Sequence, residues 1–266
     1  MRIAIVIIAA MEREVWPLVR SWKVRMIEHG GRRYRLFENV FENGGAALVC
    51  GGIGAEAARR ATEAVIREVK PERAISVGFA GALDGALRVG DILEPRMVIN
   101  AADGVRTEIG SGEGILVSSA TVADKEQKAR LRKAYGASAV DMEAAAVAQG
   151  AEARGVEFGA LKVISDAADF DLPLMDRLPS CFVASDGSFR SARFVCHVTV
   201  RPWLWRSTIA LARNSAKASR ALCGAIVSYL GRQSLGHQTL PDESLAAEGN
   251  QKEVGTTHVG RMTPSP

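Results

Sequence analysis

The sequence has few of the residues that build metal centres, disulfide frameworks or redox motifs. No two of its four cysteines stand at Cys-x-x-Cys spacing, and its four histidines are far apart in the chain. We therefore expect no metal site, and we interpret the cysteines as buried free thiols of a reducing compartment. These residues are Cys50, Cys181, Cys196, Cys223, His29, His197, His237 and His258.

Long hydrophobic runs and dense charge are also missing. No stretch reaches the ~20 apolar residues that a membrane-spanning helix needs. The apolar residues 3–8 lead directly into Met11-Glu12-Arg13-Glu14, and we interpret them as a buried first strand and not as a signal peptide. The net charge of +4 comes from scattered basic residues. We expect a cytoplasmic protein that binds no nucleic acid.

What the sequence does contain is an alternation of strand-like and helix-like segments. With 266 residues, of which 47% are hydrophobic, it predicts a single α/β domain over residues 1–230 with a largely parallel sheet. Residues 170–205 form an apolar, aromatic insertion, and residues 231–266 are expected to be a disordered tail. Strands are expected at 3–10, 74–77, 137–141 and 158–164, a hairpin at Asn43-Gly44-Gly45, a loop at 78–83, and helices at 11–20, 55–70, 124–135, 143–154 and 206–230.

Three carboxylates follow predicted strands, and each has a structural and a functional interpretation. Asp166 ends an apolar strand, where burial would favour its protonated form, or it caps a following helix. Glu143 opens a helix, either as a ligand of substrate or as a complement to the helix dipole. Glu14 activates water or is a solvated helix residue. Because ligands of open α/β sheets bind beyond the carboxyl ends of strands, the three are expected to converge.

Convergent carboxylates suit the hydrolysis of a bond between a purine and a ribose. Cleavage builds positive charge on the sugar and negative charge on the base, so one acid must protonate the purine and another group must orient the attacking water. Glycine loops at Gly51–Gly54 and Gly78–Gly81 allow close approach of a ligand, although sharp turns need them too. Met142 either contacts a sugar or belongs to the core, and Lys162 is interpreted as a strand residue that reaches outward to solvent.

At these residues the chain resembles the nucleoside phosphorylase/nucleosidase superfamily, most closely its methylthioadenosine/S-adenosylhomocysteine nucleosidase branch. The resemblance covers about residues 1–170 and 206–230. It rests on five motifs in order, Ala10-Met11-Glu12-Arg13-Glu14-Val15, Gly78-Phe79-Ala80-Gly81-Ala82-Leu83, Arg88-Val89-Gly90-Asp91-Ile92, Val140-Asp141-Met142-Glu143-Ala144 and Ile164-Ser165-Asp166-Ala167-Ala168-Asp169.

The resemblance implies a three-layer α/β/α sandwich with a mixed, partly barrel-like sheet, a homo-oligomer, and no metal or organic cofactor. It also implies roles for individual residues. Asp166 would protonate the purine with support from Ser165, Glu143 would bind the ribose hydroxyls above Met142, and Glu14 would position water. Gly78 and Phe79 would contact the substrate, and Val122 lies in the segment whose backbone recognises adenine.

Two departures from the family pattern bear on the substrate. Phosphorylases place an arginine and a hydroxyl residue around the loop that here reads Ser76-Val77-Gly78-Phe79, which has no cation and favours water over phosphate as nucleophile. The insertion at 170–205 is either a surface or oligomer contact or an apolar lid, and it resembles the hopanoid-associated members that are thought to act on adenosylhopane. A lid of this kind would suit peripheral contact with a membrane.

These features leave three hypotheses. The first is a nucleosidase that releases adenine from a 5′-modified adenosine, either methylthioadenosine-like or lipid-linked. The second is a phosphate-dependent purine nucleoside phosphorylase. The third is a non-catalytic nucleoside-binding protein on the same fold, which the joint presence of Glu14, Glu143 and Asp166 disfavours.

Overall fold

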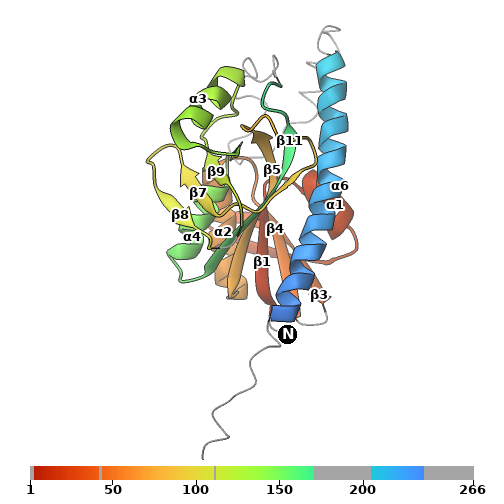
Figure 1. Cartoon of the computed structure of the whole chain (residues 1–266). Helices are drawn as coiled ribbons and strands as arrows, with labels where there is room; N and C mark the ends of the chain where they lie inside the picture. Colours follow the sequence, from red (N-terminus) through yellow and green to blue (C-terminus); the bar gives the residue numbers. More distant parts are fainter. Residues whose placement is uncertain (1–2, 42–43, 111, 171–204, 237–266) are drawn as a thin grey trace, which may run out of the picture.

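The computed structural model describes residues 3–41, 44–110, 112–170 and 205–236, which form one α/β structure around a mixed sheet (Figure 1). The strands are β1 (Ile3–Ala9), β2 (Lys23–His29), β3 (Arg32–Phe41), β4 (Gly44–Cys50), β5 (Arg73–Ala82), β6 (Ile92–Leu93), β7 (Met97–Asn100), β8 (Arg106–Glu108), β9 (Ile115–Ser118), β10 (Ala139–Asp141) and β11 (Glu157–Asp166). The helices are α1 (Glu12–Val19), α2 (Ala55–Val69), α3 (Lys125–Tyr135), α4 (Ala144–Glu152) and α6 (Trp205–Gly236).

Strand β5 is the hub of the sheet. The strands follow the order β2-β3-β4-β1-β5-β10-β9-β7-β8, and β11 and β6 branch from β5. On one edge β5 runs parallel to β1 and then antiparallel to β10, and on the other edge it runs parallel to β11 along nearly its whole length. Among the described strands the sheet does not close into a barrel, and β2 and β8 are the first and last strands of this order. The predicted α/β fold with a mixed sheet is confirmed.

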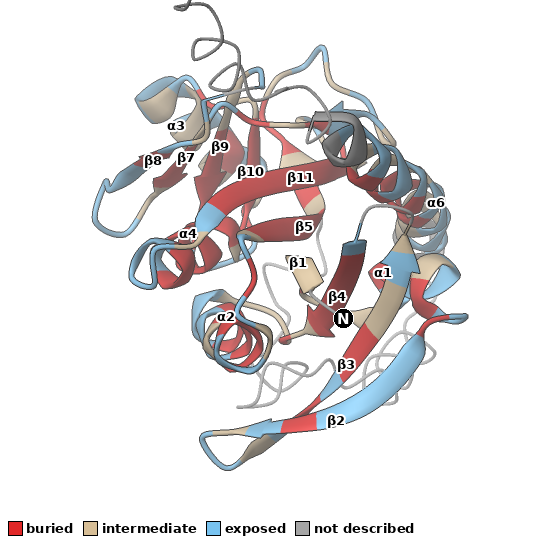
Figure 2. Cartoon of the chain, turned by 90° about the horizontal axis from the view of Figure 1, so that it is seen from below, coloured by how far each residue is buried: buried red, intermediate tan, exposed pale blue. Residues whose placement is uncertain are grey.

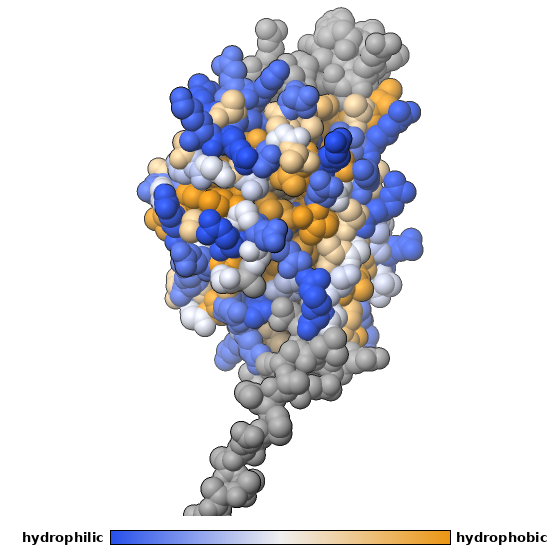
Figure 3. Space-filling model, in the orientation of Figure 1, coloured by the Kyte–Doolittle hydropathy of each residue, from blue (hydrophilic) through white to orange (hydrophobic). Residues whose placement is uncertain are grey.

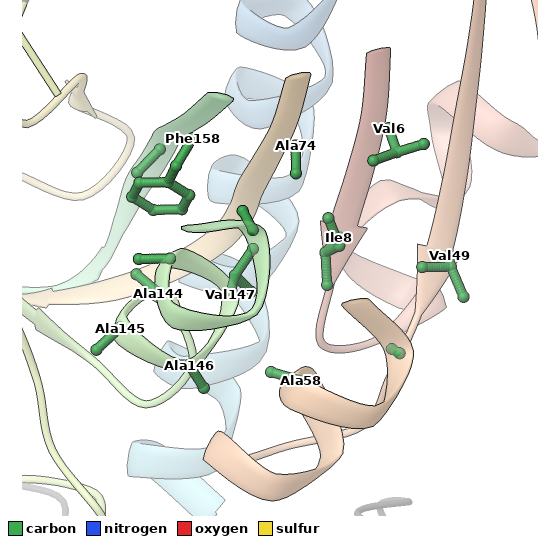
Figure 4. Packing of buried hydrophobic residues seen from close by; sticks show 14 of the residues in the cluster. Val6, Ile8, Val49, Ala58, Ala74, Ala144, Ala145, Ala146, Val147 and Phe158 are labelled. Atoms are coloured by element: carbon green, nitrogen blue, oxygen red, sulfur yellow. The ribbon is translucent and has the colours of Figure 1, made fainter. Parts of the chain in front are cut away.

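Helices cover both faces of the sheet, which gives three layers (Figures 1 and 2). Helices α2 and α4 pack on one face and α1 and α6 on the other, and each face has its own hydrophobic core. Figure 4 shows the first core, in which Ala144–Val147 of α4 and Ala58 of α2 lie close to the strands. Alanines at these positions let the two helices approach the sheet and each other closely.

Several local expectations were wrong. The predicted loop at 78–83 is mostly strand, because β5 continues to Ala82, with Gly81 paired to both β10 and β11. Strand β2 was not predicted. It is an edge strand whose side chains are mostly exposed, so it lacks the alternation of buried and exposed residues that marks a strand. Helix α6 continues past Leu230 to Gly236. The insertion predicted at 170–205 lies outside the described residues, except for its first and last residue. Residues 237–266 of the predicted tail also lie outside the described residues.

Candidate active site

A single cavity of about 350 Å³ brings together every site residue that the sequence predicts. The cavity opens where β1 and β4 end and where β5, β10 and β11 reach their last residues. It therefore lies at the carboxyl ends of parallel strands, as ligand sites in open α/β sheets do. Its lining includes Glu14, Gly78, Phe79, Val122, Met142, Glu143, Ser165 and Asp166.

Glu14 is a buried carboxylate with a free oxygen. It lies in the first turn of α1, is only 2% exposed, and its Oε2 accepts no hydrogen bond from the described part of the chain. Burial and the negative charge of Glu143 raise its pKa to about 8, while Lys162 opposes the shift. The alternative of a solvated helix residue is wrong. Such a carboxyl can accept a proton near neutral pH, which suits a general base.

Glu143 is held at the junction of two helices. It is the N-cap residue of α4, and its Oε1 accepts a 2.8 Å hydrogen bond from the Gly54 amide at the start of α2. Its Oε2 accepts a longer bond of 3.3 Å from the Met142 amide. Burial, together with the charge of Asp141, raises its pKa to about 7. The carboxylate is fixed by backbone donors and faces the cavity, so it can do more than complement the dipole of α4.

Lys162 belongs to the site, and its interpretation as an outward-reaching residue was wrong. It is 1% exposed, and its Nζ lies 2.9 Å from Asp141 Oδ2 and 2.9 Å from Ser76 Oγ. Asp141 also accepts bonds from Ser118 Oγ at 2.5 Å and from the Ala144 amide at 2.9 Å. An ammonium buried in a strand is stable only when it is paired, and Asp141 supplies the pair.

Asp166 ends β11 between a hydroxyl and an ammonium. Ser165 Oγ donates to its Oδ1 at 2.6 Å, and Lys128 Nζ of α3 forms a short ion pair with its Oδ2. Residues 167–170 form a turn, so Asp166 does not cap a helix there. The expected burial of Asp166 is confirmed, since it is 8% exposed, but the cation beside it was not expected. Lys128 was not predicted as a site residue, because it lies in a strongly charged helix.

The remaining predicted residues shape the cavity wall. Met142 and Phe79 are partly buried, and Val122 is 40% exposed in the segment that joins β9 to α3. Gly78 has a φ of 146°, and a Cβ atom there would lie 3.1 Å from Glu14 Oε2. A Cβ atom at Gly81 would lie 3.0 Å from Asp166 Oδ2. Both glycines let a carboxylate come close to β5.

An open mixed sheet covered on both faces, with acidic groups around one cavity at its strand ends, is the arrangement in which α/β proteins bind small ligands. The sequence model of the phosphorylase superfamily matches residues 4–125 and 110–178 of the chain. The chain belongs to this superfamily.

Known relatives and solved structures agree with this placement. The chain is 27% identical to a 5′-methylthioadenosine/S-adenosylhomocysteine nucleosidase of Staphylococcus aureus, over 61% of the chain and 86% of the relative. It shares the fold of futalosine hydrolase of Helicobacter pylori, with a TM-score of 0.65, 20% identity, and coverage of 86% and 98% of the two chains. A nucleosidase from Colwellia psychrerythraea in complex with adenine is 25% identical, with a TM-score of 0.53 and coverage of 63% and 84%. The similarity to these nucleosidases supports the conclusion that the chain is an N-glycosyl hydrolase.

Proposed function

We propose that the protein hydrolyses the N-glycosidic bond of a 5′-modified adenosine and releases adenine. Asp166, supported by Ser165, protonates the purine as the bond from C1′ to the base breaks and its electron pair moves into the ring. Glu143 binds the ribose hydroxyls over Met142, and the backbone near Val122 binds adenine beside Phe79. Glu14 takes a proton from the water that attacks C1′. This division between one acid and one base is the usual logic of glycoside cleavage.

The observation that carries the proposal is the unpaired Oε2 of Glu14. Buried polar atoms nearly always have a hydrogen-bond partner, and an exception calls for an explanation. A water held against this oxygen would gain an acceptor for its proton and would face the same cavity as Asp166. Glu14 and Asp166 also have different surroundings, since Glu14 lies near Glu143 and Asp166 is paired with Lys128. Two carboxyls of one site can take different roles when their surroundings differ.

The charges around Glu14 favour water over phosphate as nucleophile. The loop from Ser76 to Phe79 has no cation of its own, yet Lys162 brings an ammonium to Ser76 from β11. This ammonium is already paired with Asp141 and lies among the carboxylates of Glu14 and Glu143. A phosphate dianion would have to compete with Asp141 for this ammonium, which weakens its binding. A phosphate-dependent phosphorylase is therefore the weaker hypothesis, for a different reason than the sequence suggested.

A lipid-linked adenosine, such as adenosylhopane, is a second candidate substrate. One part of the cavity lining is apolar and includes Met11, Ile53 and Leu211, the last of which comes from α6. A long apolar 5′ substituent would gain ~0.8 kcal/mol for each CH₂ group buried against such a wall. Assembly into a homo-oligomer and peripheral contact with a membrane surface remain predictions.

The test is an adenine-release assay on the full chain with methylthioadenosine, S-adenosylhomocysteine and a lipid-linked adenosine, each with and without phosphate. We expect release without phosphate, and a loss of about 10²–10⁴-fold for Glu14→Gln and for Asp166→Asn. Glu12→Gln is the matched control on the same helix, because Glu12 is paired with exposed Arg35. A strict phosphate requirement would support the phosphorylase, and unchanged activity of Asp166→Asn would sink the acid role.

A further inference from the structure

Helix α3 has an unusual anchor. Its surface is strongly hydrophilic, and the region of the molecule over this helix is mostly blue in Figure 3. Its one fully buried residue is Lys128, whose side chain is only 3% exposed. A lysine is rarely buried unless its charge is paired. The segment that leads into α3 lines the cavity through residues 121–123, so the anchor and the cavity are joined.

The contacts of Lys128 are directed at the end of β11. Its Nζ pairs with Asp166 Oδ2 and donates a 2.8 Å hydrogen bond to the Ala167 carbonyl. A Cβ atom at Gly81 would come within 3.3 Å of Lys128 Cε and 3.0 Å of Asp166 Oδ2, so β5 makes room for this pair. With Ser165 on the other oxygen, both oxygens of the Asp166 carboxylate are held.

We infer that Lys128 is the positioning residue of the purine acid: it fixes Asp166 and stabilises the carboxylate left when the proton passes to the base. This inference rests on the proposed function. As the glycosidic bond breaks, the O–H bond of Asp166 is broken, the proton forms an N–H bond on the purine, and Asp166 becomes a carboxylate. The ammonium of Lys128 stays charged and stabilises that carboxylate. A proton from solvent then restores the acid.

Most of the other charged groups in the cavity are acidic. The charged groups that share the cavity are Glu14 and Arg13 of α1, Asp141 of β10 and Glu143 at the start of α4. Three of these four are acidic and disfavour a further carboxylate nearby. Among the cavity-lining residues, Lys128 is the cation in direct contact with Asp166. Removing Lys128 is therefore expected to leave the Asp166 carboxylate among mostly acidic neighbours, without the cation now in contact with it.

The experiment compares pH–rate profiles for adenine release by the wild type, Lys128→Met and Lys128→Arg. We expect Lys128→Met to lower kcat/KM by about 100-fold. We also expect one limb of its pH–rate profile to shift to higher pH by about one pH unit, because the carboxylate has lost its cation. Lys128→Arg keeps the charge and should leave both limbs in place. Lys125→Met, on the same helix, is the control for a change of charge alone.

The outcomes separate the inference from the function on which it rests. If the wild type releases no adenine from any of the three nucleosides, the proposed function fails. If the wild type is active and Lys128→Met lowers the rate without moving either limb, Lys128 only anchors α3, and the inference is overturned. Thermal unfolding of each variant at one pH shows whether a loss of rate reflects a loss of folding.

Discussion

Lys162 Nζ lies 2.9 Å from Asp141 Oδ2, and both side chains are almost completely buried. The pair joins β11 to β10 across β5, and the charge of Lys162 opposes the raised pKa values of both Glu14 and Glu143. It therefore sets the charge of this end of the cavity and contributes to the fold at the same time.

The first prediction concerns the contribution of this pair to the free energy of unfolding of the protein. Lys162→Met leaves Asp141 buried without its cation and should lower the free energy of unfolding by about 3–5 kcal/mol. Chemical denaturation measures the change. As a control, Glu157→Gln removes a bridge to Arg73 from a side chain that is 63% exposed, and should cost less than about 1 kcal/mol. Similar losses in both variants would contradict the special position of Lys162.

The second prediction concerns the pH dependence of stability. The pKa of Glu14 rises from an ordinary 4.5 to about 8 in the folded protein, so the folded state holds a proton that the unfolded chain loses between these values. Stability contributed by this proton is present below pH 4.5 and is lost as pH rises through 8. Glu14→Gln removes the titration, and should be more stable than the wild type at pH 9, by on the order of 4 kcal/mol, and close to it at pH 4.

Thermal melts of both proteins across this pH range test the second prediction. A difference between wild type and Glu14→Gln that does not change with pH would show that Glu14 titrates normally. Glu12→Gln serves again as the exposed control on α1, and its difference from the wild type should be small at both ends of the range.

The third prediction concerns the glycines of β5. Gly78→Ala introduces a Cβ atom 3.1 Å from Glu14 Oε2 at a φ of 146°, so it should lower kcat/KM strongly, by about 100-fold, as small displacements of reacting groups do. Gly81→Ala should also lower it, because the nearest atom is Asp166 Oδ2. Gly85→Ala is the matched control, since nothing lies within 4 Å of its Cβ position. Equal activity in all three variants would show that close approach to β5 does not matter.

The fourth prediction concerns the contact of Glu143 with the sugar. If its carboxylate binds ribose hydroxyls, Glu143→Gln should slow adenine release from methylthioadenosine by at least about tenfold. The same substitution should have little effect on the 2′-deoxy analogue, which lacks one of the hydroxyls. Equal losses on the two substrates would point instead to the Gly54 contact that joins Glu143 to α2.

The fold and the acidic residues were largely predictable from local patterns. Apolar runs that end in Asp166 or lead into Glu14 predict strands with carboxylates at their ends, and the structure places both in one cavity. Lys162 and Lys128 were not predictable in this way. A lysine in a strand or a charged helix has the same local sequence whether it faces solvent or a buried partner. Only the arrangement of β10, β11 and α3 brings those partners together.

The order of strands was also beyond the local patterns. Glu143 and Asp166 lie at the ends of two strands that are consecutive in the sequence, yet β10 and β11 lie on opposite edges of β5. This arrangement depends on long-range pairing, in which β5 meets β1 first and β10 later along the same edge. Nothing in the local sequence of β10 indicates that it runs antiparallel there.

The two glycines of β5 have a consequence for how this protein can diversify. Gly78 faces Glu14 and Gly81 faces Asp166, so the spacing of the proposed base and the proposed acid is set along one central strand, about 10 Å for three residues. The apolar wall beside them comes in part from α6, at Leu211 and Ala212. Under the proposed function, substitutions on that helix can alter which 5′ groups are accepted while Glu14 and Asp166 keep their separation. Substrate range can therefore evolve without rebuilding the chemistry.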